Sequence, residues 1–548
     1  MIRRYCATTR IHCDVSRAAF FVRFSATASA SAPPSSPASA PSTCDLLVVG
    51  AGVIGCAIAL AAARLNNGAT FRHVAVVDAG DSAGSGTTSF SSGILRSFYS
   101  VPDMMRLSWE SYQYFKSWQD FVQLPATPAT LNVRECGGIL LRSPNSNAFI
   151  DAVLLNARRY GIPAEEWDRP QTEARVERIG WDVSKNYCAR DPLADPLFGT
   201  PDPGPGISGS VYMPQTAYVA DPRLAAMQMR EAAERTGRVS FHFRRRVTCI
   251  RYGPSPSSGH FRVVGVDLDD GTKYATPCVV NAAGPQSYSV TEMAFSQRHS
   301  TRLRPNDMHF MPRPLRAEVA FLDAPEGVNL DRDGLITGDF DLGIYLRPDL
   351  GNRLLVSGIE PACDALEWLD TGAVPLDHGW ASSRGTSDGH KMYDPNDTIL
   401  SEAWERHVYR AALRMPGLAI PTSARHRRGV VSSYDVTPDW TPILDGSSRP
   451  GYYMAIGTSG NQFKNAPVIG DMMARLVEYC EGSRCAARGN DSLRHDVESF
   501  KYPMRYCHVA AQGEEAGAGG VNASLPPLDL RVFSRLRTPY VTTTSVVG

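Results

Sequence analysis

A glycine cluster at residues 50–55 constrains the fold of this chain more than any other feature. The run Gly50-Ala51-Gly52-Val53-Ile54-Gly55 follows a short apolar stretch, residues 45–49, and precedes small residues over 56–64 that predict a helix packed close to a sheet. Residues 73–78 predict a second strand, which completes a βαβ unit. The glycines permit a tight turn, a close backbone approach to a pyrophosphate and close helix–strand packing. We therefore expect an α/β fold built around a dinucleotide site.

Asp78 ends the second predicted strand, where a carboxylate accepts hydrogen bonds from the ribose hydroxyls of a dinucleotide. The same negative charge repels a 2′-phosphate, which disfavours NADP. A glycine-rich turn without a ligand would not require the strand, the helix and the acid at these distances. The fingerprint alone does not separate FAD from NAD.

Bulk properties exclude several classes of function. The 548 residues include 56 basic and 56 acidic ones, so no net charge draws the chain to nucleic acid or to an anionic membrane surface. The twelve cysteines show neither CxxC pairs nor a Cys/His cluster at metal-ligand spacing, and we expect no metal site. The apolar run at 18–22 is too short to span a bilayer, and we expect no transmembrane segment.

The two ends of the chain differ in composition from the rest. Residues 1–44 are rich in Ser and Ala and hold five arginines against the single acid Asp14, which predicts a mitochondrial transit peptide followed by an Ala/Pro/Ser linker. The alternative is an extension without an address on a cytoplasmic protein. The tail over 509–548 is expected to be poorly ordered, and residues 191–209 and 361–397 are expected to be loops or insertions.

Five further segments carry a family resemblance. They are residues 86–96 (GTTSFSSGILR), 279–284 (VVNAAG), 343–348 (GIYLRP), 434–443 (YDVTPDWTPI) and 457–467 (GTSGNQFKNAP). Together with the fingerprint, and in this order between Asp45 and about Tyr506, they resemble the D-amino-acid oxidase-like FAD superfamily, in its sarcosine oxidase and dimethylglycine dehydrogenase branch.

The resemblance implies a Rossmann-like FAD-binding domain interleaved with an antiparallel-sheet substrate domain, the glutathione-reductase-type FAD fold. The oxidoreductase would occupy residues 45–508. FAD-binding pieces are expected at about 45–135, 209–300 and 425–480, and substrate-domain pieces at about 136–208 and 301–424.

The resemblance also assigns residues to FAD. The expected cofactor-binding residues are Gly50, Gly52, Val53, Ile54, Gly55, Asp78, Thr87, Thr88, Ser92, Gly93, Ala283, Gly284, Gly457, Ser459, Gly460, Asn461, Gln462 and Lys464. The late loop enters a helix, so its backbone N–H groups suit the edge of the isoalloxazine where negative charge gathers on reduction. Phe90 and Ser432 stand where relatives carry the His or Cys that tethers the flavin, and we therefore expect FAD to be non-covalent.

Four residues are expected around the substrate. Arg96 and Lys464 fall where sarcosine oxidase-like enzymes hold the carboxylate of an amino acid, and a guanidinium fork with an ammonium is a suitable clamp for it. Each could instead be a surface cation. Tyr345 and Tyr434 fall at positions of aromatic phenols, where they either orient the amine or pack.

These features predict an FAD-dependent oxidoreductase that oxidises the C–N bond of an amino acid or N-alkyl amino acid. Val356 and Glu360 stand at the positions of a Lys and a His that serve O₂ reduction in sarcosine oxidases, so a dehydrogenase with an unidentified electron acceptor is favoured over an oxidase. One alternative is a 2-hydroxy-acid dehydrogenase, for which His309 and His426 are the candidate bases. Another is a mitochondrial respiratory-complex assembly factor in which FAD is structural.

Overall fold

The computed structural model describes residues 42–125, 130–255, 259–296, 308–369, 400–484, 499–506 and 526–540. The predicted transit peptide and linker lie outside the described residues, apart from residues 42–44. Most of the expected insertion at 361–397 also lies outside them, as do residues 509–525 and 541–548 of the expected tail.

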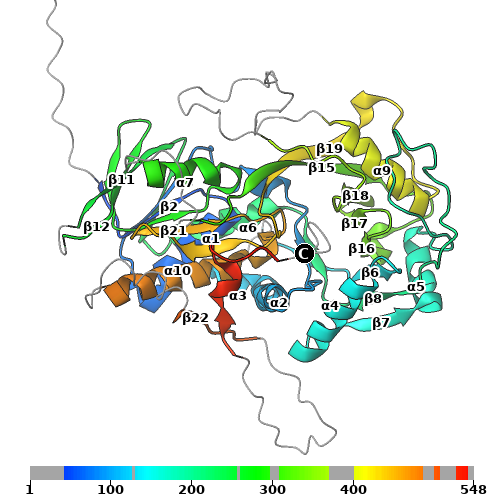
Figure 1. Ribbon diagram of the computed structural model, residues 1–548, viewed down its shortest axis with the longest axis horizontal. Helices are drawn as coiled ribbons and strands as arrows, with labels where there is room; N and C mark the ends of the chain where they lie inside the picture. Colours follow the sequence, from blue (N-terminus) through cyan, green and yellow to red (C-terminus); the bar gives the residue numbers. More distant parts are fainter. Residues whose placement is uncertain are drawn as a thin grey trace, which may run out of the picture. The chain divides into compact units, whose positions relative to one another are not determined.

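A six-stranded sheet forms the centre of the nucleotide domain (Figure 1). Its strands, in spatial order, are β10 (Val239–Phe243), β3 (Val74–Asp78), β2 (Leu46–Val49), β14 (Val279–Asn281), β21 (Tyr452–Ile456) and β20 (Ile443–Gly446). All neighbours pair in parallel except β20, which is antiparallel to β21. The βαβ unit predicted around the glycine cluster is confirmed.

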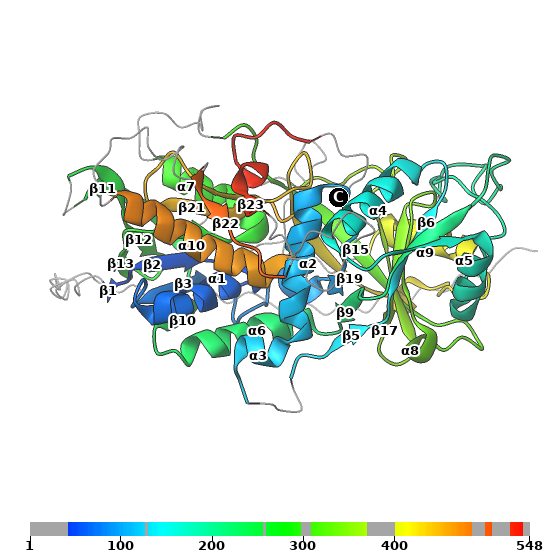
Figure 2. The same cartoon turned by 90° about the horizontal axis from the view of Figure 1, so that it is seen from below.

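Both faces of this sheet are covered, which explains why its strands are apolar throughout. Leu46 and Val48 belong to a core shared with the helices α1 (Val53–Arg64), α6 (Pro222–Glu234) and α10 (Ala466–Arg484), seen side by side in Figure 2. Leu47 and Val49 face the other way, into a core shared with α7 (Ser287–Ser296) and a four-stranded sheet. That sheet contains β1 (Ser42–Thr43), β13 (Lys273–Ala275), β12 (Phe261–Leu268) and β11 (Val247–Pro254).

The structure corrects one part of the predicted topology. The sequence of residues 263–267 (VVGVD) and 278–284 (CVVNAAG) predicts a second βαβ-like return. The first segment is instead part of β12, which pairs antiparallel with β11 and β13, and only β14 enters the parallel sheet. Alternating burial along β12 fits an antiparallel strand that covers the parallel sheet with one face.

The second large sheet has eight strands. In spatial order it contains β19 (Arg428–Val436), β15 (Arg313–Asp323), β18 (Arg353–Gly358), β17 (Ile344–Asp349), β16 (Ile336–Asp339), β6 (Gly138–Arg142), β8 (Gly209–Met213) and β7 (Glu165–Asp168). Helix α9 (Glu402–Arg414) packs against one face of it. Strands β8 and β19 both belong to this sheet, where β8 pairs with β6 and β19 pairs with β15. The expected FAD-binding pieces begin at 209 and 425, so the chain crosses from this sheet to the parallel sheet within each of these pieces.

The remaining elements connect the two sheets or border them. A three-stranded sheet contains β4 (Ile94–Leu95), β9 (Ala217–Val219) and β5 (Val133–Glu135). The other helices are α2 (Pro102–Lys116), α3 (Trp118–Val122), α4 (Asn147–Tyr160), α5 (Arg169–Val176) and α8 (Leu330–Asp333). Residues 191–208 contain no helix or strand, as their Pro/Gly/Asp content predicted.

Part of the C-terminal tail is ordered, contrary to expectation. β23 (Leu528–Asp529) pairs with β22 (Lys501–Tyr502), and a 3-10 helix at Leu530–Phe533 follows it. Leu528, Leu530 and Phe533 are fully buried in the main core. The expectation of a disordered tail is therefore wrong for residues 526–540, where a few apolar side chains anchor a segment that follows a Gly-rich stretch.

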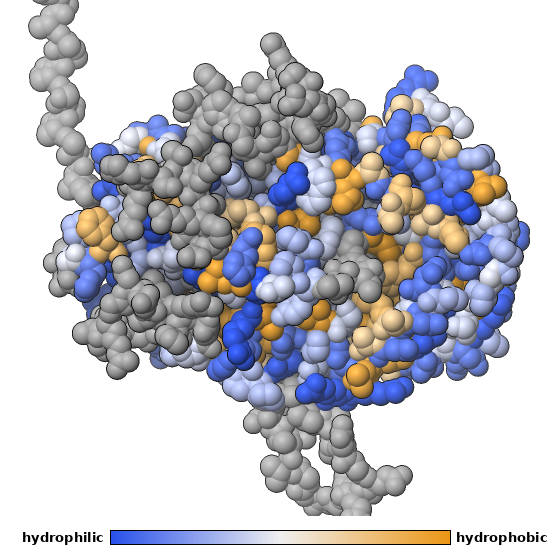
Figure 3. All heavy atoms as spheres, in the orientation of Figure 1, coloured by the Kyte–Doolittle hydropathy of each residue, from blue (hydrophilic) through white to orange (hydrophobic). Residues whose placement is uncertain are grey.

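The surface of the described part mixes polar and apolar residues. On the face drawn in Figure 3 the two kinds are interspersed, as on an ordinary protein surface. No helix among the described residues has the length and apolar character that crossing a bilayer would require.

The contact between α1 and α10 generates a stability prediction. A Cβ on Gly470 would lie 2.5 Å from the carbonyl oxygen of Ala57, so the two helices approach too closely for any side chain there. We expect Gly470→Ala to lower the free energy of unfolding by about 1–3 kcal/mol, because the helices must separate. Thermal and urea unfolding measure this change.

Gly482→Ala is the matched control in the same helix. A Cβ at Gly482 meets no atom within 4 Å, so alanine there should stabilise α10 by roughly 0.5–1 kcal/mol through its higher helix propensity. Equal effects of the two substitutions would contradict the packing argument.

Candidate functional site

A cavity of about 800 Å³ lies at the carboxyl ends of the parallel strands. The turn after β2, the end of β3, the segment 85–92, the turn between β10 and β11, and residues 282–286 line it on the side of the parallel sheet. Residues of β19 and of the late loop, 457–465, complete the lining. A smaller cavity of about 70 Å³ shares the lining residues Ser91, Ser92, Tyr434, Gly460 and Phe463 with the larger one.

The three fingerprint glycines occupy three different environments. Gly50 has a φ of +104°, and a Cβ there would lie 2.4 Å from the carbonyl oxygen of Ala282. A Cβ on Gly55 would lie 1.8 Å from the carbonyl oxygen of Gly50, so only glycine lets α1 start this close to the strand. Gly52 lines the larger cavity and caps α1 without a side chain. The predicted tight turn at Gly50 and close helix–strand packing at Gly55 are confirmed, and the approach of a pyrophosphate to Gly52 stays a prediction.

The helix start and Asp78 together form a polar end of the larger cavity. The first turn of α1 consists of Val53, Ile54 and Gly55, so the positive end of the helix dipole meets the cavity without an acidic side chain. The Asp78 carboxylate accepts hydrogen bonds from the N–H groups of Ala51 (2.5 Å) and Gly80 (2.6 Å). Burial raises the pKa of Asp78, and these two hydrogen bonds oppose the rise.

Three consecutive arginines, Arg244, Arg245 and Arg246, line the cavity near Asp78 and were not predicted as site residues. The backbone N–H groups of Arg244 and Arg245 donate to the carbonyls of Gly80 and Asp78, which fixes this turn beside the end of β3. Arg244 adopts a left-handed φ of +55°. The run of three consecutive arginines was the available signal in the sequence.

The early turn is held by two buried contacts. Thr88 Oγ1 accepts a hydrogen bond from the Val53 N–H at 3.0 Å, which joins the turn to the start of α1. Arg347, from the GIYLRP motif, donates to the Ser92 carbonyl at 2.8 Å and pairs with Asp349 at 2.7 Å. Sequence reasoning missed this role of Arg347, although the residue lies within a motif that it singled out.

Most of the eighteen predicted cofactor residues line a cavity, and four do not. Gly50, Gly52, Val53, Ile54, Asp78, Thr87, Thr88, Ser92, Ala283, Gly284, Gly460 and Gln462 line the larger one, and Asn461 and Lys464 line the smaller one. Gly55, Gly93, Gly457 and Ser459 lie behind the lining. Gly93 is required there because a Cβ would meet the Val219 carbonyl oxygen at 2.3 Å.

The late loop folds back on the end of β19. The Gly457 N–H donates to the Asp435 carboxylate at 2.7 Å, and the Ser459 N–H donates to the Asp435 carbonyl at 3.0 Å. A Cβ on Gly460 would lie 2.5 Å from the Tyr434 ring, so the glycine lets that ring lie against the loop. The loop then enters α10, whose first turn contains Pro467 as predicted.

The structure brings Arg96 and Lys464 together at the smaller cavity, on the ring of Tyr99. The Arg96 guanidinium carbon lies 4.7 Å from the ring centroid and Lys464 Nζ lies 5.2 Å from it. Arg96 donates to the Phe98 carbonyl at 2.7 Å, and Lys464 donates to the Asn461 carbonyl. Among the described residues, no acidic side chain forms an ion pair with Lys464.

Burial and mutual repulsion shift the pKa values of this pair. Burial lowers the pKa of Lys464 well below its usual value, and the positive charge of Arg96 lowers it further. Burial also lowers the pKa of Arg96. Tyr345 and Tyr434 line the same cavity, and burial raises the pKa of both phenols, which therefore remain neutral. An anion between the two cations would relieve the cost of burying them.

The structure corrects the position assigned to Val356. Val356 pairs with Leu346 and is buried in the core beneath α9, on the face of the sheet away from the cavity. Its neighbour Ser357 is opposite Tyr345 and shares the cavity face. Val356 therefore does not face the cavity, and neither position holds a lysine.

The two histidines considered as bases lie elsewhere. His309 contacts the backbone of Arg535 and Arg537 in the C-terminal segment, and His426 is exposed. Neither lines either of the two cavities described here. Among the described residues, no group of three His, Cys, Asp or Glu side chains is placed to hold a metal ion.

Fold and cavity indicate a dinucleotide-binding protein, and sequence comparison gives its family. The model of the DAO family, described as FAD dependent oxidoreductase, matches residues 45–476, and the chain belongs to this family. A comparison with curated protein sequences finds no matching relative.

Solved structures with the same fold are distant in sequence. L-proline dehydrogenase from P. horikoshii superposes with a TM-score of 0.57 at 16% identity, over 80% of this chain and 94% of that one. Glycine oxidase from Geobacillus kaustophilus gives 0.54 at 19% identity, over 80% and 95%. L-alpha-glycerophosphate oxidase from Mycoplasma pneumoniae, a structure with FAD bound, gives 0.54 at 14% identity, over 80% and 95%.

The cofactor of this family is FAD, and the residues present fit it. At Gly52 no side chain separates the backbone from the larger cavity, and the N-terminus of α1 would face the diphosphate. The Asp78 carboxylate would accept hydrogen bonds from the ribose. The loop formed by Gly460 and Gln462 lines its other end.

The lining of the larger cavity generates a prediction about attachment. Phe90 and Ser432 both line it, and none of the described residues that line it is Cys or His. We expect FAD to be held without a covalent bond, so acid precipitation of the purified protein should leave the yellow colour in the supernatant. Flavin that stays with the pelleted polypeptide after washing in denaturant would contradict this.

Proposed function

We propose that this member of the FAD-dependent oxidoreductases dehydrogenates the C–N bond of a small amino acid or N-alkyl amino acid. The observation that carries the proposal is a pair of cations, the half-buried Arg96 and the buried Lys464, on one ring beside the FAD cavity. A binding protein with a structural flavin would not require this pair. Solved structures with similar folds, which include an L-proline dehydrogenase, a glycine oxidase and an L-amino acid deaminase, support the substrate class.

The two cations would hold the substrate carboxylate. The Arg96 guanidinium offers parallel N–H donors for a bidentate contact, and the Lys464 ammonium adds a point charge. The Tyr99 ring fixes the Arg96 guanidinium and the Lys464 ammonium, since both lie over it. Carboxylate binding fixes one end of the substrate, and the volume of the smaller cavity, about 70 Å³, favours a compact amino acid.

The lining of the smaller cavity also determines how the substrate amine loses its proton. None of the described residues that line it is Asp, Glu or His, so no side chain there acts as a strong base. The two nearby cations instead lower the pKa of the bound ammonium and favour the neutral amine. Tyr345 and Tyr434 remain protonated and orient it. Bound FAD supplies the hydride acceptor for the substrate carbon.

Dehydrogenase rather than oxidase chemistry is part of the proposal. Of the described residues that line the two cavities, Lys464 is the only lysine, and its ammonium already contacts Asn461 and the Tyr99 ring. A separate lysine for O₂ reduction, as sarcosine oxidases have, is therefore not among them. The hydroxy-acid alternative loses support because His309 and His426 do not line the cavities.

Anaerobic titration of the holoenzyme tests the proposal. We expect an amino acid or N-methyl amino acid to bleach the flavin absorbance, and Lys464→Met to raise the substrate Kd about 10–100-fold because a charged hydrogen bond is lost. FAD content should be unchanged. Lys501→Met, which removes a half-exposed lysine paired with Asp529, is the control and should have no effect.

The same titration separates the alternatives. Bleaching by 2-hydroxy acids alone would establish the other enzymatic function, and bleaching by no member of the panel would favour an assembly role. Admitting air to the reduced enzyme then tests the acceptor: we expect slow reoxidation, and reoxidation within a turnover would identify an oxidase.

The lowered pKa of Lys464 generates a pH prediction. Binding of benzoate, a carboxylate that cannot be oxidised, requires the protonated ammonium. Its affinity should be constant at low pH and fall as pH rises through the lowered pKa, by up to about tenfold per pH unit. Lys464→Arg should move the fall to higher pH, because a guanidinium stays charged. A wild-type profile identical to that of Lys464→Met would contradict the clamp.

A further inference from the structure

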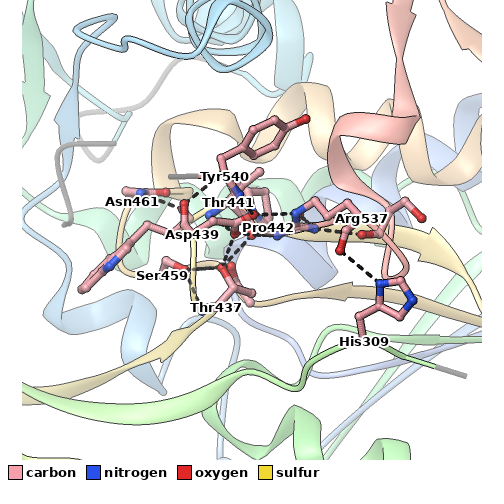
Figure 4. Close-up of polar contacts among 12 residues, drawn as sticks. His309, Thr437, Asp439, Thr441, Pro442, Ser459, Asn461, Arg537 and Tyr540 are labelled. Atoms are coloured by element: carbon pink, nitrogen blue, oxygen red, sulfur yellow. Dashed lines mark hydrogen bonds and ion pairs between the residues drawn. The ribbon is translucent and has the colours of Figure 1, made fainter. Parts of the chain in front are cut away.

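The C-terminal segment, residues 526–540, lies beyond the part of the chain that matches the family, which ends at residue 476. It returns to the nucleotide domain and packs against the turn 437–442, which follows β19. Figure 4 shows this contact, with Arg537 directed at Asp439. The site considered above therefore rests in part on residues distant from it in sequence.

Arg537 and Asp439 form a buried, two-point ion pair. Arg537 Nε donates to Asp439 Oδ2 at 2.8 Å and Nη2 donates to Oδ1 at 2.7 Å. Their side chains are only 4% and 0% exposed. Nη2 also donates to the Thr441 carbonyl at 2.6 Å, and Nη1 to the Pro442 carbonyl at 3.2 Å. One guanidinium thus holds the carboxylate and both carbonyls of the turn.

This ion pair also sets the charge state of the turn. Burial alone would raise the pKa of Asp439, but the hydrogen bonds and the charge of Arg537 hold it below its usual value. The Tyr540 N–H adds a further hydrogen bond to Oδ2 at 3.3 Å. The carboxylate therefore remains ionised and fixed.

The turn at residues 437–442 also contacts the late loop at two places. Trp440 adopts a left-handed φ of +55°, and its carbonyl accepts a hydrogen bond from Asn461 Nδ2 at 3.3 Å. Thr437 Oγ1 donates to Asp439 Oδ1 at 3.1 Å and lies 3.4 Å from Ser459 Oγ. Both Ser459 and Gly460 have positive φ values, so this part of the loop needs external support.

Asn461 links the turn to the cation pair. Its side chain reaches the Trp440 carbonyl, and its own carbonyl accepts the hydrogen bond from Lys464 Nζ. The contacts therefore run from Arg537 through Asp439 and the turn to Asn461 and Lys464. The neighbouring Gly460 and Gln462 line the FAD cavity.

We propose that Arg537 is a positioning residue, which fixes the late loop, and with it Gly460, Gln462 and Lys464, through Asp439. The effect on Lys464 rests on the proposed function, whereas the effect on the FAD-lining residues does not. The C-terminal segment is then part of the site's support and not only of the fold's stability.

Arg535 provides a matched control in the same segment. It is buried to the same degree and pairs with another buried aspartate, Asp445, at 3.2 Å. Asp445 belongs to β20 and receives the Arg535 backbone N–H at 2.9 Å. Arg535 thus anchors the segment to the sheet edge, whereas Arg537 anchors it to the turn that holds the late loop.

The experiment compares Arg537→Gln with Arg535→Gln as purified holoenzymes, well below their melting temperatures. Three quantities are measured: the Kd of FAD, the visible absorption spectrum of the bound flavin, and the Kd of benzoate. We expect Arg537→Gln to raise the Kd of FAD at least about tenfold and to alter the flavin band shape, because the loop is misplaced. Arg535→Gln should lower the melting temperature comparably but leave both Kd values within about twofold.

A conservative variant keeps the test decisive if the Gln variants do not fold. Arg537→Lys retains the charge but not the two-point geometry, and it should raise the Kd of FAD above that of Arg535→Lys. Equal Kd values and superimposable flavin spectra within either matched pair overturn the proposal. If wild-type enzyme does not bind benzoate, the carboxylate clamp fails, while the FAD measurements still decide the role of Arg537.

Discussion

Three backbone segments meet at the turn after β2, where none of them leaves room for a side chain. Gly50 touches the carbonyl of Ala282, and Gly55 touches the carbonyl of Gly50, so the starts of α1 and of the segment after β14 are fixed against each other. This contact determines where the positive end of α1 lies and forms the floor of the larger cavity. The early turn depends on it as well, because Thr88 Oγ1 accepts a hydrogen bond from the Val53 N–H at the start of α1.

The buried charges in and near the site have two different kinds of partner. Asp435, Asp439 and Asp445 are each fully buried, and each is met by backbone N–H groups or by an arginine. Lys464 is equally buried, but its ammonium contacts a carbonyl and an aromatic ring instead of a carboxylate. Burying a charge without an opposite one is expensive, and such an arrangement persists where a ligand completes it. The contrast within one small region is the physical basis for proposing that Lys464 binds an anionic group, whereas the three aspartates hold the structure.

The parts of the fold that the sequence predicts are those with local signals. The strand, glycine turn and helix over 45–64 follow from apolar runs and from glycines whose Cβ would clash, and α6 begins at Pro222 as expected. Arg96 and Lys464, which we propose hold the substrate carboxylate, were predicted from family motifs, and the structure places both at one cavity.

What the sequence did not predict depends on pairings between distant segments. The register that buries Val356 is set by its neighbours β15 and β17, and β12 resembles a parallel strand until its antiparallel partners are known. Arg537 and Asp439 lie far apart in the chain, and the Gly-rich stretch before residue 526 gives no indication of the apolar anchors that follow it. Side-chain chemistry alone gives no indication of such partners.

The strand order of the parallel sheet has a consequence for biosynthesis. β2 is made early in translation, yet its neighbour β14 and the outer strand β21 come from much later parts of the chain. The cavity floor at Gly50 requires Ala282, and its far wall requires the loop after β21. A nascent chain therefore has no complete cofactor site until nearly all of the enzyme has left the ribosome. Flavin captures only the finished fold and stabilises it by mass action, so the steady-state amount of this protein in a cell should follow the supply of FAD.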